Sequence, residues 1–230
     1  MPHRRRTGNE VLDRMPAERR GELVRRAELF HLQKEHILAE PRHPSSKVFF
    51  PTTAVISVML PLQMGQRVEA GTVGCEGVVG IPAILGRRPR EIAIVQIPGE
   101  AYAVDASAVA PLLYDKQVGP AIAAYIGYAY TIAKQNGACN AFHGIAQRTA
   151  RWLLTAQDRA RRSEFPLTQE LLSHMVGATR ARVGEAALAL RAAGVIDYRR
   201  GRMHIKDRGR LERLSCECYA ATRWTPAGSG

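Results

Sequence analysis

The stretch from Phe165 to Arg208 constrains the fold of this chain more than any other part. Two segments with apolar residues at helical spacing follow each other there, separated by Gly177, where a tight turn needs a positive φ. Thr168 and Thr179 each precede one of these segments, and a threonine hydroxyl in that place can accept from the free amides of the first helical turn. The pattern predicts two short helices joined by a tight turn, which is a helix-turn-helix.

A short hairpin is predicted directly after the second helix. Gly194 stands where a helix commonly ends in a glycine. Residues 195–198 and 203–205 are rich in strand-forming side chains, and the basic segment 199–201 between them contains a glycine. This arrangement is typical of a β-hairpin. We therefore expect a winged helix-turn-helix.

The first turn of the second helix carries charged side chains away from its apolar face, at Arg180, Arg182 and Glu185. Guanidinium groups at the exposed N-terminal end of a helix can enter the major groove of DNA and bond to guanine in pairs. A solvated helix face is the alternative for any one of these arginines. The combination of caps, glycine turn, basic helix and basic wing favours base reading by these three residues.

The charge of the chain agrees with an anionic partner. The formal net charge is +12 and the isoelectric point is near 10.1, which favours nucleic acid or a membrane surface. Residues 143–214 hold 15 Arg and Lys against 7 Asp and Glu, so 8 of the excess positive charges lie with the helix-turn-helix. No apolar run approaches the length of a membrane span, and the four cysteines show no disulfide framework. Because the first residues contain no apolar segment, we expect no secretory signal. We expect a cytoplasmic protein without a membrane partner.

The N-terminal half has a different pattern of apolar and turn-forming residues. From residue 30 to residue 104, short apolar runs alternate with Gly and Pro every eight to twelve residues, which predicts many short antiparallel strands closing as a roll or sandwich. Glycines recur at every third position from Gly71 to Gly80, and we interpret them as tight corners and close strand approaches. A phosphate-binding loop is the alternative, but neither Gly-x-Gly-x-x-Gly nor Gly-Lys-Ser/Thr is present.

A longer helix is predicted from residue 119, with Pro120 at a permitted first-turn position. It ends or hinges at Asn136-Gly137. Small and apolar residues at heptad-like spacing suggest a seam between two copies of the helix; they are Ile122, Ile126, Ala129 and Ala133. A helix packed on its own domain gives the same pattern, and two heptads do not separate the two possibilities.

No catalytic constellation is evident, since the chain lacks both a Gly-x-Ser-x-Gly elbow and a His-Glu-x-x-His motif. Cys216 and Cys218 together with His204 raise the question of a metal site. Tetrahedral zinc normally takes four ligands, so a Cys-x-Cys pair needs two more nearby. We therefore expect no enzyme activity, no metal and no cofactor.

The order of these parts resembles the Crp–Fnr family of bacterial transcription regulators. The matching segments are residues 50–52, 71–86 and 167–196 and the closing Ser-Cys-Glu-Cys-Tyr at 215–219. The resemblance implies an α+β fold, with an N-terminal antiparallel β-roll, a long dimerisation helix and a C-terminal winged helix-turn-helix. It divides the chain into a cyclic-nucleotide-binding-like sensor at 1–118, a dimerisation helix and hinge at 119–141, a DNA-binding domain at 142–220 and a tail at 221–230.

The family resemblance implies a homodimer that binds a near-palindromic operator in double-stranded DNA and works with RNA polymerase. Arg180 matches a position where members commonly read a guanine, whereas Ala181 and Glu185 depart from the cyclic-AMP branch, so a different operator is expected. The matched positions that contact the DNA backbone are Thr168, Thr179, Arg199, Arg200, Gly201 and Arg202. The alternative is a small-molecule sensor whose basic domain binds RNA or a protein.

The sensor segment departs further from the family pattern. Gly80 begins the matching cassette, but Ile81 stands where nucleotide-binding members place the glutamate that holds the ribose. Arg90 could be the phosphate-binding arginine, yet Glu91 follows it and would repel a phosphate. We therefore expect a degenerate sensor of unknown effector, with Gly80 and Arg90 as its remaining candidate residues. The cysteine cluster of the oxygen-sensing branch is missing from residues 1–30, so an iron–sulfur centre is not expected.

Overall fold

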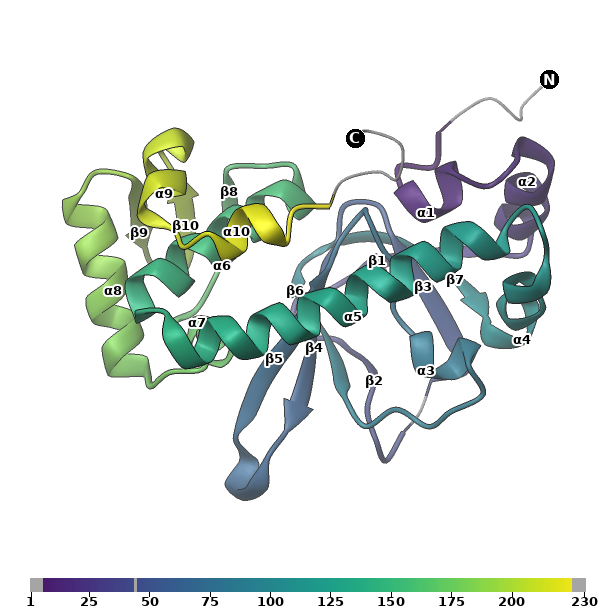
Figure 1. Ribbon diagram of the computed structural model, residues 1–230, viewed down its shortest axis with the longest axis horizontal. Helices are drawn as coiled ribbons and strands as arrows, with labels where there is room; N and C mark the ends of the chain where they lie inside the picture. The colour runs from purple at the N-terminus through teal and green to yellow at the C-terminus, as the bar shows by residue number, and fades with distance from the viewer. Residues whose placement is uncertain (1–5, 44, 225–230) are drawn as a thin grey trace.

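The computed structural model describes residues 6–43 and 45–224. It confirms the α+β class, with antiparallel strands in the N-terminal half, one long helix and a C-terminal domain built around a helix-turn-helix (Figure 1). Of the predicted tail, residues 225–230 lie outside the described residues. Within the described part, no helix is both long and apolar enough to cross a membrane.

Two antiparallel sheets form the β-roll. One has the strand order β1 (Glu28–Leu32), β7 (Gly99–Asp105), β3 (Lys47–Pro51), and the other β2 (Ile37–Ala39), β6 (Ile92–Ile97), β4 (Val55–Pro61), β5 (Arg67–Val73). Short helices lie around the sheets: α1 (Glu10–Asp13), α2 (Ala17–Arg25), η1 (Gln63–Gly65), α3 (Ile81–Ile84), α4 (Ala106–Val109) and η2 (Ala110–Tyr114). Phe50 and Ile56 are completely buried. Burial does not alternate along the inner strands: β6 is buried at every residue and β3 at all but Lys47, so both faces of these strands are covered.

The glycines at every third position mark close approaches, but mainly to helices rather than to strands. A Cβ atom on Gly77 would lie 2.3 Å from the ring of Tyr125, and one on Gly74 would lie 2.4 Å from Cβ of Arg159. Gly80 has a φ of 102°, which a larger side chain would strain. The loop after β5 therefore passes directly under the long helix.

The long helix, α5 (Gly119–Phe142), runs across the molecule from the roll to the C-terminal domain (Figure 1). The predicted end or hinge at Asn136-Gly137 is wrong, because the helix continues to Phe142. Asn136 is buried, its Nδ2 donates to the carbonyl of Ala70 at 2.9 Å and its Oδ1 accepts from Nη1 of Arg151 at 2.7 Å. Asparagine normally favours helix ends, but here its side chain connects β5 to the C-terminal domain through two hydrogen bonds.

The C-terminal domain contains α6 (Ile145–Ala160), β8 (Glu164–Pro166), α7 (Gln169–Val176), α8 (Arg180–Ala192), β9 (Ile196–Arg199), β10 (Arg202–Ile205), α9 (Arg208–Leu214) and α10 (Cys218–Ala221). The predicted wing hairpin is confirmed as β9 and β10. A third strand, β8, pairs with β10 and adds to the two strands that the sequence predicts for the wing. Its Pro166 is compatible with an edge strand, since it lacks only an amide donor.

The two domains share an apolar core. Val55, Met59 and Ile97 of the roll belong to the same buried cluster as Trp152 of α6. Met175 of α7 also contacts the roll, with its Sδ 3.2 Å from Oγ of Ser57 and 2.7 Å from Nε2 of Gln96. The helix-turn-helix is thus docked against β4, β5 and β6.

An ion pair is buried in the same interface. Nε of Arg159 on α6 lies 2.6 Å from Oε1 of Glu76 in the loop after β5, and both side chains are almost inaccessible to solvent. Burial opposes ionisation of Arg159, but the Glu76 carboxylate, together with Tyr128 and Tyr125, outweighs this effect and keeps the pKa of Arg159 raised. No local sequence pattern signals this pair, whose partners are far apart along the chain.

Candidate nucleic-acid interface and sensor cavity

The turn of the helix-turn-helix has the geometry that its sequence predicts. Oγ1 of Thr168 accepts from the amide of Leu171 at 3.2 Å and so caps α7. Gly177 ends α7 with a φ of 63° in the left-handed region. Thr179 occupies the N-cap of α8 with extended backbone, but its side chain makes no cap hydrogen bond. The exposed Thr179 hydroxyl therefore remains available to a phosphate oxygen.

Helix α8 separates a packing face from a charged face. Its buried residues are Val183, Ala186, Ala187 and Leu190, whereas Arg180, Arg182 and Glu185 are exposed. Nη2 of Arg180 lies 2.6 Å from Oε1 of Glu170, with the two side chains 61% and 57% exposed. A pair so exposed is worth about 1 kcal/mol or less. Arg180 can consequently exchange Glu170 for a base edge at little cost.

The wing is a tight hairpin held against the helix-turn-helix. Arg200 and Gly201 both have positive φ, 48° and 74°, as a two-residue turn of the mirror-image type requires. The amide of Leu167 donates to the carbonyl of Gly201 at 2.8 Å, and the hydroxyl of Tyr198 donates to the carbonyl of Leu167 at 3.1 Å. The turn is therefore fixed relative to α7.

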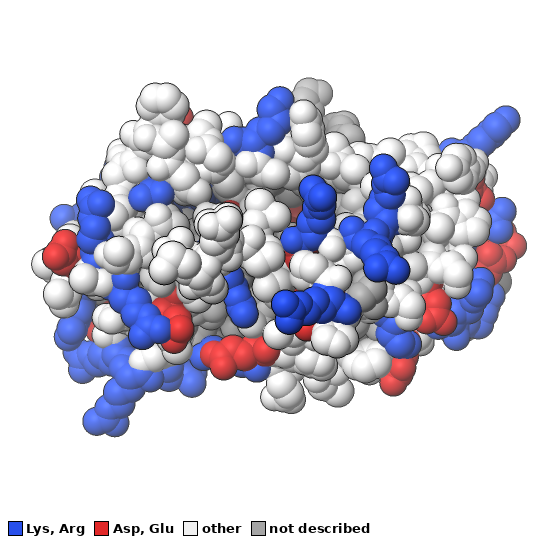
Figure 2. All heavy atoms as spheres, turned by 90° about the horizontal axis from the view of Figure 1, so that it is seen from below, with Lys and Arg blue, Asp and Glu red and all other residues white. Residues whose placement is uncertain are grey.

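The other two wing arginines are exposed and each faces a nearby carboxylate. Arg199 lies 3.2 Å from Asp197, and Arg202 lies 2.6 Å from Glu164 on β8. Figure 2 shows Lys and Arg gathered at the left-hand end of the molecule, where the C-terminal domain lies, with only a few acidic side chains among them. All six predicted backbone-contacting residues lie in this domain, and the surface around them suits a polyanion.

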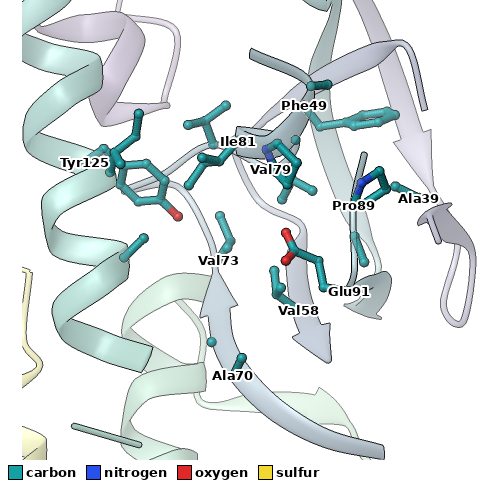
Figure 3. Close-up of a pocket in the computed structure, with 18 of the residues that line it drawn as sticks. Ala39, Phe49, Val58, Ala70, Val73, Val79, Ile81, Pro89, Glu91 and Tyr125 are labelled. Atoms are coloured by element: carbon teal, nitrogen blue, oxygen red, sulfur yellow. The ribbon is translucent and has the colours of Figure 1, made fainter. Parts of the chain in front are cut away.

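A cavity of about 310 Å³ lies between the roll and α5. Its lining is largely apolar, and Figure 3 shows Phe49, Val73, Val79 and Ile81 around it. The carboxylate of Glu91 also lies in this lining, and burial raises its pKa. The cavity offers mainly a carboxylate and hydrocarbon, whereas a cyclic nucleotide needs cations for its phosphate and acceptors for its ribose hydroxyls.

The two candidate effector residues have different positions. Gly80 lines the cavity, but Arg90 is exposed and does not line it. Among the lining residues that the structure describes, Lys47 is the one basic residue, and its Nζ lies 3.7 Å from Oε2 of Glu28. Arg90 in contact with an effector phosphate is therefore not supported by the geometry.

The residues predicted as a dimer seam face the roll. Ile122 is 1% exposed within the core of the roll, and Ile126, Ala129 and Ala133 line the cavity. The placement of Ile122 in a seam between chains is wrong, because its side chain is already enclosed. Ile126 and Ala129 are half-buried and Ala133 is exposed, so for these three residues the seam stays a prediction.

Comparison with known proteins is consistent with this geometry. Residues 147–214 match the Crp-like helix-turn-helix domain family, and no curated protein matches the chain. A transcriptional regulator of the CRP family from Thermus thermophilus has a TM-score of 0.68 at 17% identity, covering 82% of this chain and 96% of that one. FixK2 from Bradyrhizobium japonicum has a TM-score of 0.69 at 19% identity, with 83% and 98% covered. The c-di-GMP-responsive global regulator CLP from Xanthomonas campestris has a TM-score of 0.64 at 14% identity, with 83% and 99% covered. At these identities the shared property is the fold.

Proposed function

We propose that this chain is a transcription regulator of the Crp–Fnr type that acts as a homodimer on a near-palindromic operator in double-stranded DNA, a proposal supported by its Crp-like helix-turn-helix domain and its fold. The observation that carries the proposal is the charged face of α8, where Arg180 and Arg182 are exposed beyond a fully packed opposite face. In this proposal Arg180, Arg182 and Glu185 read bases, while the two threonine caps and the wing contact phosphates. RNA polymerase is the proposed partner on the promoter.

A second face of α5 supports the dimer. Exposed residues recur along it at Ala123, Gly127, Tyr130 and Lys134, with helical spacing. A Cβ atom added to Gly127 or Gly137 would meet nothing within 4 Å, so the packing of the chain itself does not require these glycines. Each costs a helix about 1 kcal/mol relative to alanine. Close approach of a second α5 would explain their presence.

The dimer would also connect the cavity to DNA. One face of α5 lines the cavity, and we assign the adjoining exposed face, which meets the cavity lining at Tyr130, to the partner chain. An effector that enters the cavity would push on α5 and so change the separation of the two recognition helices, which is a rigid-body transition of a known kind. The apolar lining supports a small effector of apolar character, and the response of CLP to c-di-GMP does not carry over to a lining of this kind.

The test begins with selection of bound duplexes from a random pool, followed by anisotropy titrations with the selected operator and a scrambled duplex. Arg180→Ala should weaken operator binding by about 1–3 kcal/mol, the value of a bidentate base contact, and leave scrambled binding almost unchanged. Arg191→Ala is the matched control, because Arg191 lies in the last turn of the same helix beside Asp197. Equal losses of affinity for the operator and the scrambled duplex would exclude base reading by Arg180. Preference for RNA over the operator in competition would favour the alternative function.

A further inference from the structure

Four side chains with metal-binding atoms meet where α5 ends. Cys139 and His143 come from the end of α5 and the residue after it, and Cys216 and Cys218 come from the segment after α9. Their ligand atoms all lie within 4.8 Å of one another. The pairing of Cys216 and Cys218 with His204, considered from the sequence, is wrong, because His204 is exposed on β10. Folding supplies the two further ligands from residues more than 70 positions away.

The distances in this cluster suit a tetrahedral ion. Sγ of Cys139 lies 3.5 Å from Sγ of Cys216, and Sγ of Cys218 lies 3.5 Å from Nδ1 of His143. Zinc bonds of about 2.3 Å to sulfur and about 2.0 Å to nitrogen, at tetrahedral angles, separate neighbouring ligand atoms by roughly 3.5–3.8 Å. A disulfide would need about 2.05 Å. The cysteines are free thiols at the spacing of co-ligands.

We propose that Cys139, His143, Cys216 and Cys218 bind one zinc ion. Three thiols and an imidazole form a closed donor set that is typical of structural rather than catalytic zinc. The three cysteines are at most 4% exposed and form a buried cluster separate from both apolar cores. Water has little access to such a site, as a structural ion requires.

Neighbouring groups orient two of the ligands. Nε2 of His143 lies 3.0 Å from Oε1 of Glu217, so Nε2–H can donate a hydrogen bond to the carboxylate, which leaves Nδ1 free to bind the ion. This carboxylate–histidine arrangement is common around protein-bound zinc. Nε2 of Gln135 donates to Sγ of Cys218 at 3.0 Å. A thiolate bound to zinc accepts such a hydrogen bond better than a neutral thiol does.

The charged side chains around the four-residue cluster also suit a bound zinc ion. Zinc with three thiolates carries one net negative charge, and the side chains of Arg148 and Arg151, each 7% exposed, lie near enough to interact with Cys139. The buried Nε atoms of both arginines have no hydrogen-bond partner among the described residues. Two buried guanidinium groups are therefore close to a cluster that becomes anionic only when the metal is bound.

The zinc would hold the C-terminal segment to the end of α5. Cys216 and Cys218 follow the wing and α9, whereas Cys139 belongs to the helix that we assign to the dimer. One ion would thus join the two ends of the DNA-binding domain at the point where it meets α5. Loss of the ion should loosen the domain and leave the roll intact.

The test uses the full-length chain purified anaerobically with a thiol reductant. Elemental analysis should find one zinc per chain in the wild type and in Cys75→Ser, whose cysteine is equally buried but outside the cluster. Cys216→Ser and His143→Asn should lose most of the zinc, while His204→Asn should keep it. Exchange for cobalt should give the visible absorption of a tetrahedral thiolate site. His143→Cys, which replaces one ligand by another, should retain one metal per chain with a shifted cobalt spectrum.

Three results would overturn the proposal. The first is folded wild-type protein that takes up no zinc after addition of zinc chloride. The second is an equal zinc content in the wild type and in Cys216→Ser. The third is iron with acid-labile sulfide in place of zinc. If Cys216→Ser fails to fold, the zinc content of His143→Cys and the cobalt spectrum of the wild type still decide the question.

Discussion

The buried pair between Glu76 and Arg159 allows a quantitative test of how the β-roll and the C-terminal domain are held together. Glu76→Gln preserves the shape of the side chain and removes its charge. The variant leaves the Arg159 guanidinium, 2.6 Å away and about 7% exposed, without its counter-ion. Nη2 of Arg159 would keep only its neutral contact with the hydroxyl of Tyr128 at 3.2 Å.

The expected loss follows from burial. Removal of one partner from a buried ion pair costs about 3–5 kcal/mol, because a desolvated charge is left uncompensated. Arg159→Met should cost a similar amount. The double variant should lose about 2–3 kcal/mol less than the sum of the two single variants, since it leaves no buried charge behind.

The assay is urea unfolding followed by circular dichroism. Glu164→Gln is the matched control: Glu164 lies 2.6 Å from Nε of Arg202, the same distance as in the buried pair, but the two side chains are 50% and 66% exposed. This control should lose less than about 1 kcal/mol. Equal losses in Glu76→Gln and Glu164→Gln, or strict additivity in the double variant, would refute the argument that burial sets the energy.

Three further predictions concern the dimer, the sheet and the cavity. Gly127→Leu should shift the protein from dimer to monomer in light scattering, because a large side chain separates the helices, while the exposed Ala146→Leu on α6 should not; a dimeric Gly127→Leu would exclude this face. Burial raises the pKa of Glu69, so the free energy of unfolding should fall as pH rises from about 4 through the folded-state pKa. Glu69→Gln should lack that fall, so the free energy of unfolding of the variant minus that of the wild type should increase with pH in urea titrations. A difference that stays constant with pH would contradict this reasoning. Cyclic AMP should leave the melting temperature unchanged, because Ile81 cannot hold the ribose, and a rise in melting temperature would count against the degenerate sensor.

The helix-turn-helix and its wing were predictable because their sequence signals are local. A threonine cap, a glycine at positive φ and a glycine-containing turn each act within a few residues, so Thr168, Gly177 and Gly201 could be placed from sequence alone. The turn expected over residues 199–201 comprises only Arg200 and Gly201, because Arg199 pairs with Arg202. Strand β8 was missed because three residues ending in Pro166 carry no periodicity. Its pairing with β10 depends on tertiary structure.

The remaining features depend on contacts between distant segments. Heptad-like spacing showed that Ile126 and Ala129 share a face, but spacing does not say whether that face meets another chain or the chain's own cavity. Arg90 was assigned by its position in a motif, and the loop that carries it turns the side chain to solvent. The grouping of Cys139 with Cys216 requires that α5 and the C-terminal segment lie together, which no local pattern reports.

Docking of Met175 against Ser57 and Gln96 has a thermodynamic consequence for the proposed regulator. If operator binding draws α7 away from the roll, those contacts and the nearby lining of the cavity change together. Linkage then requires that any effector which alters operator affinity by a given factor has its own affinity altered by the operator to the same extent. A titration of effector into protein already bound to operator would therefore report the coupling as directly as a DNA-binding assay.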